Sequence, residues 1–344
     1  MIQVGGNEIY YPKEIIMPNP EPAMTPALPK VDLHRHLEGS LRLQTVLEVS
    51  KAHGLPLPAW EVDSLKPHIW IQEPANDILK VFPRFDLARN IFVDYDVCRR
   101  AAWECLEDAA AQGLDTLELR FSPLYMAEPH GLDPMSVASV VCEAWEEAKT
   151  RLPIHARLIG ILSRTYGPQA CEIELNAVLA HRQRGIVGLD LAGDEARQPA
   201  PLFEDHFRRA REAGLHVTVH AGEFAGVESV RQAVDLLGAE RLGHAVRVVD
   251  DPGLMERLAE RGIAIECCPT SNVLTCAVPD YASHPLPIFL EHGLIATLNT
   301  DDPGLMGDLT LEEEYRHARD EMGLSRAQLD QVQRNGLRAA FQDR

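Results

Sequence analysis

The chain has 344 residues, 45% hydrophobic and 25% charged, a composition typical of a soluble globular protein with a sizeable core. Its formal net charge of −19 argues against nucleic acids and anionic membranes as partners, because both require a basic surface. No apolar run reaches the ~18 residues of a membrane span, and no basic-then-apolar leader is present. Seven cysteines without CxxC spacing favour a reducing, cytoplasmic setting.

The sequence predicts two parts. Residues 1–29 carry six prolines and are expected to form an irregular N-terminal extension. Residues 30–344 are expected to form a single domain. Nothing in the sequence demands an oligomer, so a monomer or a weak homo-oligomer is expected.

Eight strands are predicted within this domain, most of them near-continuous apolar runs typical of strands buried on both faces. They are Lys30–His36, Leu114–Phe121, His155–Leu162, Val187–Ala192, His216–His220, Arg241–Ala245, Gly262–Cys267 and Leu294–Asn299. Amphipathic helical segments lie between the later strands, at Leu202–Ala213, Ser229–Leu237 and Leu254–Arg261. Glycines 214, 238 and 262 are expected to end these helices. The alternation favours an α/β fold, a (β/α)8 TIM barrel, over a doubly wound sheet.

About 77 residues separate the first two predicted strands, more than one crossover helix needs. Extra helices are therefore expected after the first strand, over the C-terminal face of the barrel. Phe82 and Phe85 are three residues apart and suit one face of a short helix. That helix would either cover the substrate or only pack on the barrel, and both phenylalanines are candidate substrate contacts.

Polar segments follow five of the predicted strands, and in a parallel barrel these strand ends meet on the catalytic face. They are His34-Arg-His36, Asp190 to Glu195, His220-Ala-Gly-Glu223, Gly243-His244 and Asn299 to Pro303. Side chains far apart in the sequence can therefore share one site. An HxH pair alone is weak evidence, because structural histidines also give it.

Four of these side chains are candidate metal ligands. His34 and His36 point the same way because they are two apart on a strand. His220 and Asp301 close two other strands. Three imidazole nitrogens and one carboxylate suit a single Zn²⁺ and leave room for a water ligand, whose pKa the metal lowers towards neutrality.

Four further residues are candidates for catalysis and binding. Glu223, three residues past His220, is suited to donate and accept a proton once burial raises its pKa. His244 is placed to orient the hydroxide and take its proton. Asp302, beside the metal-ligating Asp301, is free to hydrogen-bond the substrate. Gly193 lets a ligand ring approach the backbone.

Together these segments resemble the adenosine deaminases of the metal-dependent amidohydrolase superfamily, over nearly the whole chain from about residue 30. Glu118-Leu-Arg-Phe-Ser-Pro123 and Cys268-Pro-Thr-Ser-Asn272 also match, and His-Arg-His with Arg-Phe-Ser-Pro is closest to the bacterial enzymes. The resemblance implies zinc on His34, His36, His220 and Asp301. It also implies that Glu223 protonates purine N1, that His244 orients the hydroxide attacking C6, that Asp302 holds N7 and that Gly193 N–H contacts N3.

Two positions depart from the family pattern. Glu38 stands where adenosine deaminases usually have an aspartate that contacts the ribose, and one added methylene alters which sugar 5′ end fits. Ala245 stands where glycine is common.

The expected function is deamination of adenosine and deoxyadenosine, with aminodeoxyfutalosine, another 5′-modified nucleoside or free adenine as alternatives. A non-catalytic purine-binding barrel is the further alternative; the cytidine deaminase signatures HxE and PCxxC are absent.

Overall fold

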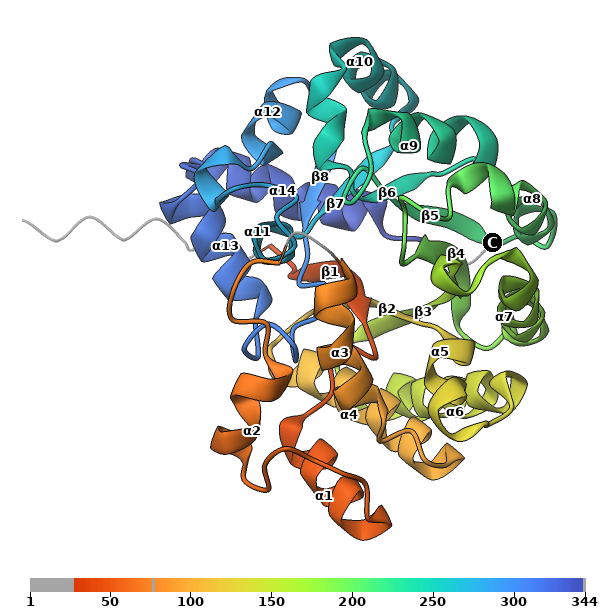
Figure 1. The fold of residues 1–344 in the computed structure, drawn as a ribbon. Coiled ribbons are helices and arrows are strands. Elements are labelled where there is room, and N and C mark those ends of the chain that lie inside the picture. Colours follow the sequence, from red (N-terminus) through yellow and green to blue (C-terminus); the bar gives the residue numbers. More distant parts are fainter. Residues whose placement is uncertain (1–27, 76–77, 343–344) are drawn as a thin grey trace, which may run out of the picture.

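Eight parallel strands form the barrel of this computed structural model, which describes residues 28–75 and 78–342 (Figure 1). Each strand pairs in parallel with the next one along the chain. The strands are β1 Val31–His36, β2 Thr116–Phe121, β3 His155–Ser163, β4 Ile186–Ala192, β5 His216–Ala221, β6 Arg241–His244, β7 Ala264–Cys267 and β8 Ile295–Leu298. The predicted TIM barrel is confirmed, with strand ends that differ from prediction by up to two residues. Residues 1–27 of the predicted N-terminal extension, which is expected to cover residues 1–29, lie outside the described residues.

The barrel closes where the chain leaves β8 and meets β1. The backbone N–H of His36 donates to the carbonyl of Asp301 at 2.8 Å, and the N–H of Asp301 donates to the carbonyl of His34 at 2.8 Å. A parallel bridge between Arg35 and Asp301 marks the same point. The two segments that carry the candidate metal ligands His34, His36 and Asp301 therefore join β8 to β1, and we call this junction the seam of the barrel.

Helices surround the strands in Figure 1. Four lie between β1 and β2, as the long interval predicted: α1 Leu43–His53, α2 Val62–Ile69, α3 Ile78–Arg89 and α4 Tyr95–Ala111. The others are α5 Pro123–Ala127, α6 Pro134–Arg151, α7 Pro168–His181, α8 Glu204–Glu212, α9 Val227–Gln232, α10 Pro252–Arg261, α11 Pro269–Leu274, α12 Leu286–Glu291, α13 Leu311–Asp320 and α14 Arg326–Ala339. The predicted helix Ser229–Leu237 is divided into α9 and a π-helical stretch, Ala233–Leu237.

The helix α3 contains both phenylalanines that the sequence singles out. Phe85 is partly buried and packs against the main hydrophobic core. The side chain of Phe82 lies outside the described part of the chain, so its predicted contact with substrate stays a prediction.

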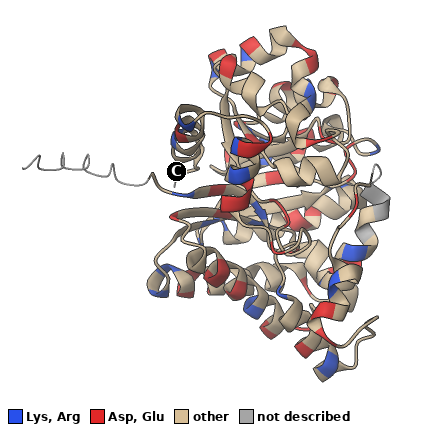
Figure 2. Cartoon of the chain, turned by 90° about the vertical axis from the view of Figure 1, so that its left-hand side faces the viewer, with Lys and Arg blue, Asp and Glu red and all other residues tan. Residues whose placement is uncertain are grey.

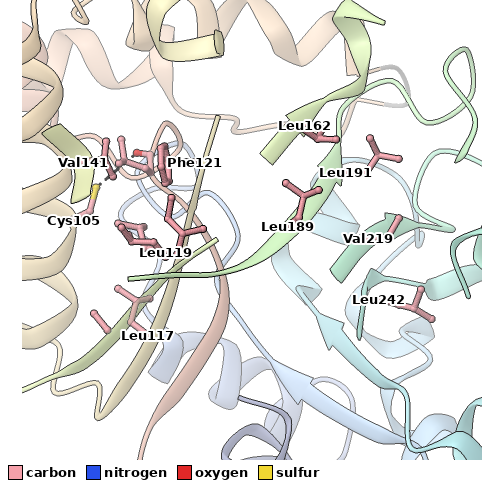
Figure 3. Packing of buried hydrophobic residues seen from close by; sticks show 14 of the residues in the cluster. Cys105, Leu117, Leu119, Phe121, Val141, Leu162, Leu189, Leu191, Val219 and Leu242 are labelled. Atoms are coloured by element: carbon pink, nitrogen blue, oxygen red, sulfur yellow. Dashed lines mark hydrogen bonds between the residues drawn. The ribbon is translucent and has the colours of Figure 1, made fainter. Parts of the chain in front are cut away.

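The alternation of side chains along β2 separates two environments. Leu117, Leu119 and Phe121 are fully buried in the hydrophobic core, where Figure 3 shows Phe121 beside Val141 of α6. Because successive residues of a strand face opposite sides, Glu118 and Arg120 project into the barrel instead. The inside of this barrel therefore holds charged groups, which must be paired to be tolerated there.

Outside the barrel, acidic and basic residues are interspersed along the helices (Figure 2). Among the described residues, none of the helices combines the length and apolar character needed to cross a bilayer. The vicinal thiols Cys267 and Cys268 are free and fully buried.

Candidate active site

Five side chains from four strand ends converge at the C-terminal face of the barrel. We call them the imidazole cluster: His34, His36, His220, His244 and Asp301. The Nε2 atoms of His34 and His220 are 3.1 Å apart, and those of His36 and His220 are 3.3 Å apart. Asp301 Oδ1 lies 3.1 Å from His34 Nε2 and 3.3 Å from His36 Nε2.

These separations match the edges of a metal coordination shell. A tetrahedral ion with bonds of about 2.0–2.1 Å holds its ligand atoms about 3.3 Å apart. One ligand atom from each of His34, His220, His244 and Asp301 also lies within 4.8 Å of the others. However, His244 Nε2 is 3.9 Å from Asp301 Oδ2, beyond the spacing of the other four groups. The donor set and its spacing therefore fit a zinc-type ion at His34, His36, His220 and Asp301.

Buried acids orient two of the imidazoles. Glu266 Oε2 lies 2.7 Å from Nδ1 of His34, and Asp190 Oδ2 lies 3.0 Å from Nδ1 of His220. Arg120 joins the two acids, with hydrogen bonds of 2.7 Å to Asp190 and 2.8 Å to Glu266. We call Arg120, Asp190 and Glu266 the arginine-linked network. It holds each Nδ1 proton on the acid side, so each Nε2 lone pair faces the centre of the cluster.

The charges in the cluster favour a bound cation. Burial lowers the pKa of His36, of His220 and of His244, which keeps these imidazoles neutral. Burial raises the pKa of Asp301, but the facing His34 outweighs it and the pKa falls well below its usual range. Burial and Arg120 lower the pKa of His34, but Asp301 and Glu266 outweigh them and the pKa rises. The neutral imidazoles of His36 and His220 and the ionised carboxylate of Asp301 are in the protonation states that a metal requires.

Strained backbone is concentrated at the same point. His244, Ala245 and Asp301 have φ of 61°, 46° and 62°, in the left-handed region that non-glycine residues rarely adopt. This conformation explains why a glycine suits the position of Ala245.

The loop after β5 places Glu223 above the cluster. Glu195 accepts hydrogen bonds from the backbone N–H groups of residues 222–225, with distances from 2.5 to 3.1 Å. Gly222 has φ of 74°, and a Cβ atom there would lie 2.7 Å from Val230. This turn carries Glu223 Oε2 to 3.5 Å from His244 Nε2.

A cavity of about 310 Å³ opens over the cluster. Nearly all of the predicted site residues line it: His36, Glu38, Phe85, Gly193, His220, Glu223, His244, Asp301 and Asp302. His34 lies beneath it and is fully buried. The structure therefore brings these sequence-predicted residues together around one space, at the low end of the usual size for small-molecule sites.

Three residues that line the cavity, Glu223, Asp302 and Gly193, are suited to contact a ligand. Burial, with Asp301 nearby, raises the pKa of Glu223 and of Asp302 well above the usual range, so each can hold a proton. Asp302 Oδ1 is buried without a hydrogen-bond partner in the described part of the chain. Gly193 has φ of 112°, and a Cβ atom there would approach Thr165 Oγ1 at 2.5 Å. No other residue type suits that position.

A second pair of acids borders the cavity. Glu38 accepts a hydrogen bond of 2.6 Å from the backbone N–H of Ser122. Behind it, Glu174 accepts from the hydroxyl of Ser122 and, at 2.6 Å, from the N–H of Ser163. Burial raises the pKa of Glu38 and of Glu174 to about 7. We call Glu38 and Glu174, which are joined through Ser122, the serine-linked pair.

Sequence reasoning missed the roles of the supporting residues. Arg120, Asp190 and Glu266 each stand inside an apolar strand, and such a charge is a signal of a polar barrel interior. By contrast, Tyr125 and Tyr166 line the cavity without a motif to mark them.

Comparisons with known proteins agree with this geometry. Residues 29–344 match the family model described as adenosine deaminase. The chain is 49% identical over 315 residues to the adenosine deaminase of Klebsiella pneumoniae, covering 92% of this chain and 94% of that protein. It is 48% identical over 314 residues to that of Escherichia coli, covering 91% and 94%.

Solved structures share the fold. The adenine deaminase of Arthrobacter aurescens superposes with a TM-score of 0.82 at 25% identity, covering 92% of this chain and 95% of that chain. A zinc-bound amidohydrolase from Burkholderia ambifaria gives 0.82 at 30% identity, covering 92% and 86%. The Arabidopsis ADAL complex with IMP gives 0.79 at 26%, covering 92% and 92%. The family match over nearly the whole chain and the close bacterial relatives place this protein in the adenosine deaminase family.

Proposed function

We propose that this protein is a zinc-dependent deaminase of 6-aminopurine nucleosides, converting adenosine and deoxyadenosine into inosine and deoxyinosine with release of ammonia. The observation that carries the proposal is one cavity in which Glu223, whose pKa is raised by burial, lies beside the imidazole cluster. The names of the similar proteins, adenosine deaminase and adenine deaminase, agree with this chemistry.

One Zn²⁺ is assigned to His34, His36, His220 and Asp301. Three neutral nitrogens and one carboxylate are a zinc donor set that leaves net positive charge at the centre. When bound, zinc lowers the pKa of a water ligand and makes hydroxide available at neutral pH.

Four residues of the chain then bind the purine and assist the reaction. Protonated Glu223 gives its proton to N1, which makes C6 electrophilic. The protonated carboxyl group of Asp302 donates a hydrogen bond to N7, while the backbone N–H of Gly193 donates to N3. His244 lies beside the attacking oxygen. Release of ammonia from C6 leaves the 6-oxopurine.

Ammonia release by the zinc-loaded protein tests the proposal, with adenosine, deoxyadenosine, adenine, aminodeoxyfutalosine and cytidine in parallel. Rapid turnover of adenosine and deoxyadenosine is expected, with cytidine inert. Turnover confined to aminodeoxyfutalosine or adenine would reassign the substrate. If no purine releases ammonia although zinc is bound and adenosine still binds, a non-catalytic barrel would be favoured.

The variant Glu223→Gln tests the proton donor. Because glutamine fills the same volume but cannot supply the proton, kcat should fall by at least about a thousandfold while zinc content stays unchanged. Near-normal turnover would remove Glu223 from this role.

We also place the protein in a reducing, cytoplasmic compartment, supported by seven free thiols, of which only Cys276 is exposed. Cell fractionation with an antibody against the protein tests this placement.

A further inference from the structure

A chain of three buried hydrogen bonds leads from the backbone to the ring of His244. The backbone N–H of Leu286 donates to Nδ1 of His284 at 3.1 Å. His284 Nε2 lies 3.1 Å from Asn272 Oδ1, and Asn272 Nδ2 lies 2.9 Å from His244 Nδ1. The side chains are only 2%, 0% and 1% exposed for His284, Asn272 and His244, so water does not compete for these bonds.

The direction of every bond in this chain is fixed by its first donor. A backbone N–H can only donate, so Nδ1 of His284 accepts and the ring proton of His284 is on Nε2. That proton is donated to Asn272, which must therefore present its oxygen to His284. The amide NH₂ group of Asn272 is left to donate to His244.

We propose that Asn272 and His284 are positioning residues that hold His244 with its proton on Nε2, as a hydrogen-bond donor towards the reacting oxygen. Because Nδ1 of His244 accepts, the ring is not the doubly protonated form, and its single proton is on Nε2. Nε2 faces Glu223 and Asp301, at 3.5 and 3.9 Å.

Two consequences follow for the site. A protonated Nε2 cannot ligate a metal, which separates His244 from His34, His36 and His220 although all four rings lie together. The same Nε2 cannot take a proton from the attacking water at the start of the reaction. His244 therefore acts first as a donor that orients the oxygen and stabilises its negative charge, instead of the proton acceptor that the sequence suggested.

The first test is spectroscopic and independent of turnover. Zinc-loaded protein labelled with ¹⁵N-histidine is expected to show, in a long-range ¹H–¹⁵N spectrum, a protonated Nε2 and an unprotonated Nδ1 for His244. The resonances are assigned by their loss in His244→Gln. A protonated Nδ1 in the wild-type protein would overturn the proposal, even if the proposed deaminase activity is confirmed.

The second test reverses the last bond. In Asn272→Asp a carboxylate replaces the donor, so the proton of His244 should move to Nδ1. Imposing the wrong tautomer on a catalytic histidine can cost about 10⁴-fold in kcat. We expect a fall in kcat of at least about a hundredfold, with zinc content unchanged and KM within about threefold.

Two companion variants complete this test. Asn272→Leu removes the donor without imposing the opposite tautomer, and its loss should be smaller, about tenfold. Asn335→Asp makes the same substitution on α14, where the amide donates to the carbonyl of Ala296 at 2.9 Å, and should leave kcat within twofold. Wild-type kcat in Asn272→Asp with the tautomer reversed would overturn the proposal. If Asn272→Asp fails to fold, the wild-type spectrum decides.

The inference rests on the proposed function for its kinetic arm alone. If wild-type protein deaminates no purine, the proposed function fails while the spectrum still decides the tautomer. If the wild type is active and its spectrum shows the opposite tautomer, only the positioning role fails.

Discussion

Two groups of buried carboxylates support the site, one beneath the imidazole cluster and one around Glu38 at the cavity wall, and their charges are balanced in opposite ways. In the arginine-linked network burial raises the pKa of Glu266, but Arg120 and Arg241 outweigh it and the pKa falls well below its usual range. In the serine-linked pair only hydrogen bonds oppose burial at Glu174, and its pKa rises to about 7. The network therefore holds fixed charges beneath the proposed metal ligands, whereas the pair can change its protonation near neutral pH.

This contrast suits the arginine-linked network and the serine-linked pair to different functions. Charged groups in a fixed array suit metal binding, because ligand orientation and protonation must not vary. A carboxyl group that is easily protonated, such as Glu38, suits recognition of a substrate hydroxyl, since it can donate or accept. Each of the following substitutions tests that distinction.

The largest effect is expected at the centre of the imidazole cluster. Asp301→Ala removes the only carboxylate among the assigned ligands, so zinc content should fall and turnover should drop by more than about a thousandfold. Elemental analysis and ammonia release measure both. The control Asp320→Ala removes an exposed acid on α13. Full zinc occupancy in Asp301→Ala would contradict its role as ligand.

Glu266→Gln should have the next largest effect. It removes the charge that holds the Nδ1 proton of His34, and loss of such a supporting acid typically costs about 10–100-fold in metal affinity. It also leaves Arg120 and Arg241 with less compensation, so unfolding should become easier. Competition with a chelator and urea unfolding measure the two effects. An unchanged zinc affinity would show that the network does not act through the metal.

Glu38→Asp tests the serine-linked pair. Shortening the side chain by one methylene withdraws the carboxylate by about 1.5 Å. The ratio of kcat/KM for adenosine to that for a 5′-modified nucleoside should rise by about tenfold, with zinc content unchanged. An unaltered ratio would remove Glu38 from substrate selection.

Glu174→Gln should have the smallest effect on the reaction, and its effect on stability should depend on pH. The folded pKa of Glu174 is about 7, against 4.5 for the free group, so the folded protein keeps a proton that the unfolded chain releases. The resulting stability is complete below pH 4.5 and is lost as the pH rises to 7. Relative to Glu174→Gln, the wild type should lose stability on the order of 2 kcal/mol between pH 5 and 8. Urea unfolding at the two pH values measures this change. If wild type and Glu174→Gln differ in unfolding free energy by the same amount at both pH values, the assignment is contradicted.

The barrel and most of the site could be predicted from sequence because both depend on local patterns. Apolar runs predicted the strands, and the polar residues that end them had to meet on one face. The arginine-linked network was missed because its three members come from three strands, and pairing across a barrel interior has no local signal. The protonated nitrogen of His244 depends on Leu286, 42 positions away along the chain, and only three-dimensional contacts reveal that link.

The seam between β8 and β1 has a consequence for how the protein is made. Asp301 meets His36 across 265 positions of sequence, and closing a loop of that length costs about 5 kcal/mol in chain entropy. A chain emerging from the ribosome has the first two of the proposed histidine ligands early but the proposed carboxylate ligand only near the end of synthesis. The proposed zinc site is then complete only when the barrel is complete, so prematurely terminated chains would lack its carboxylate ligand.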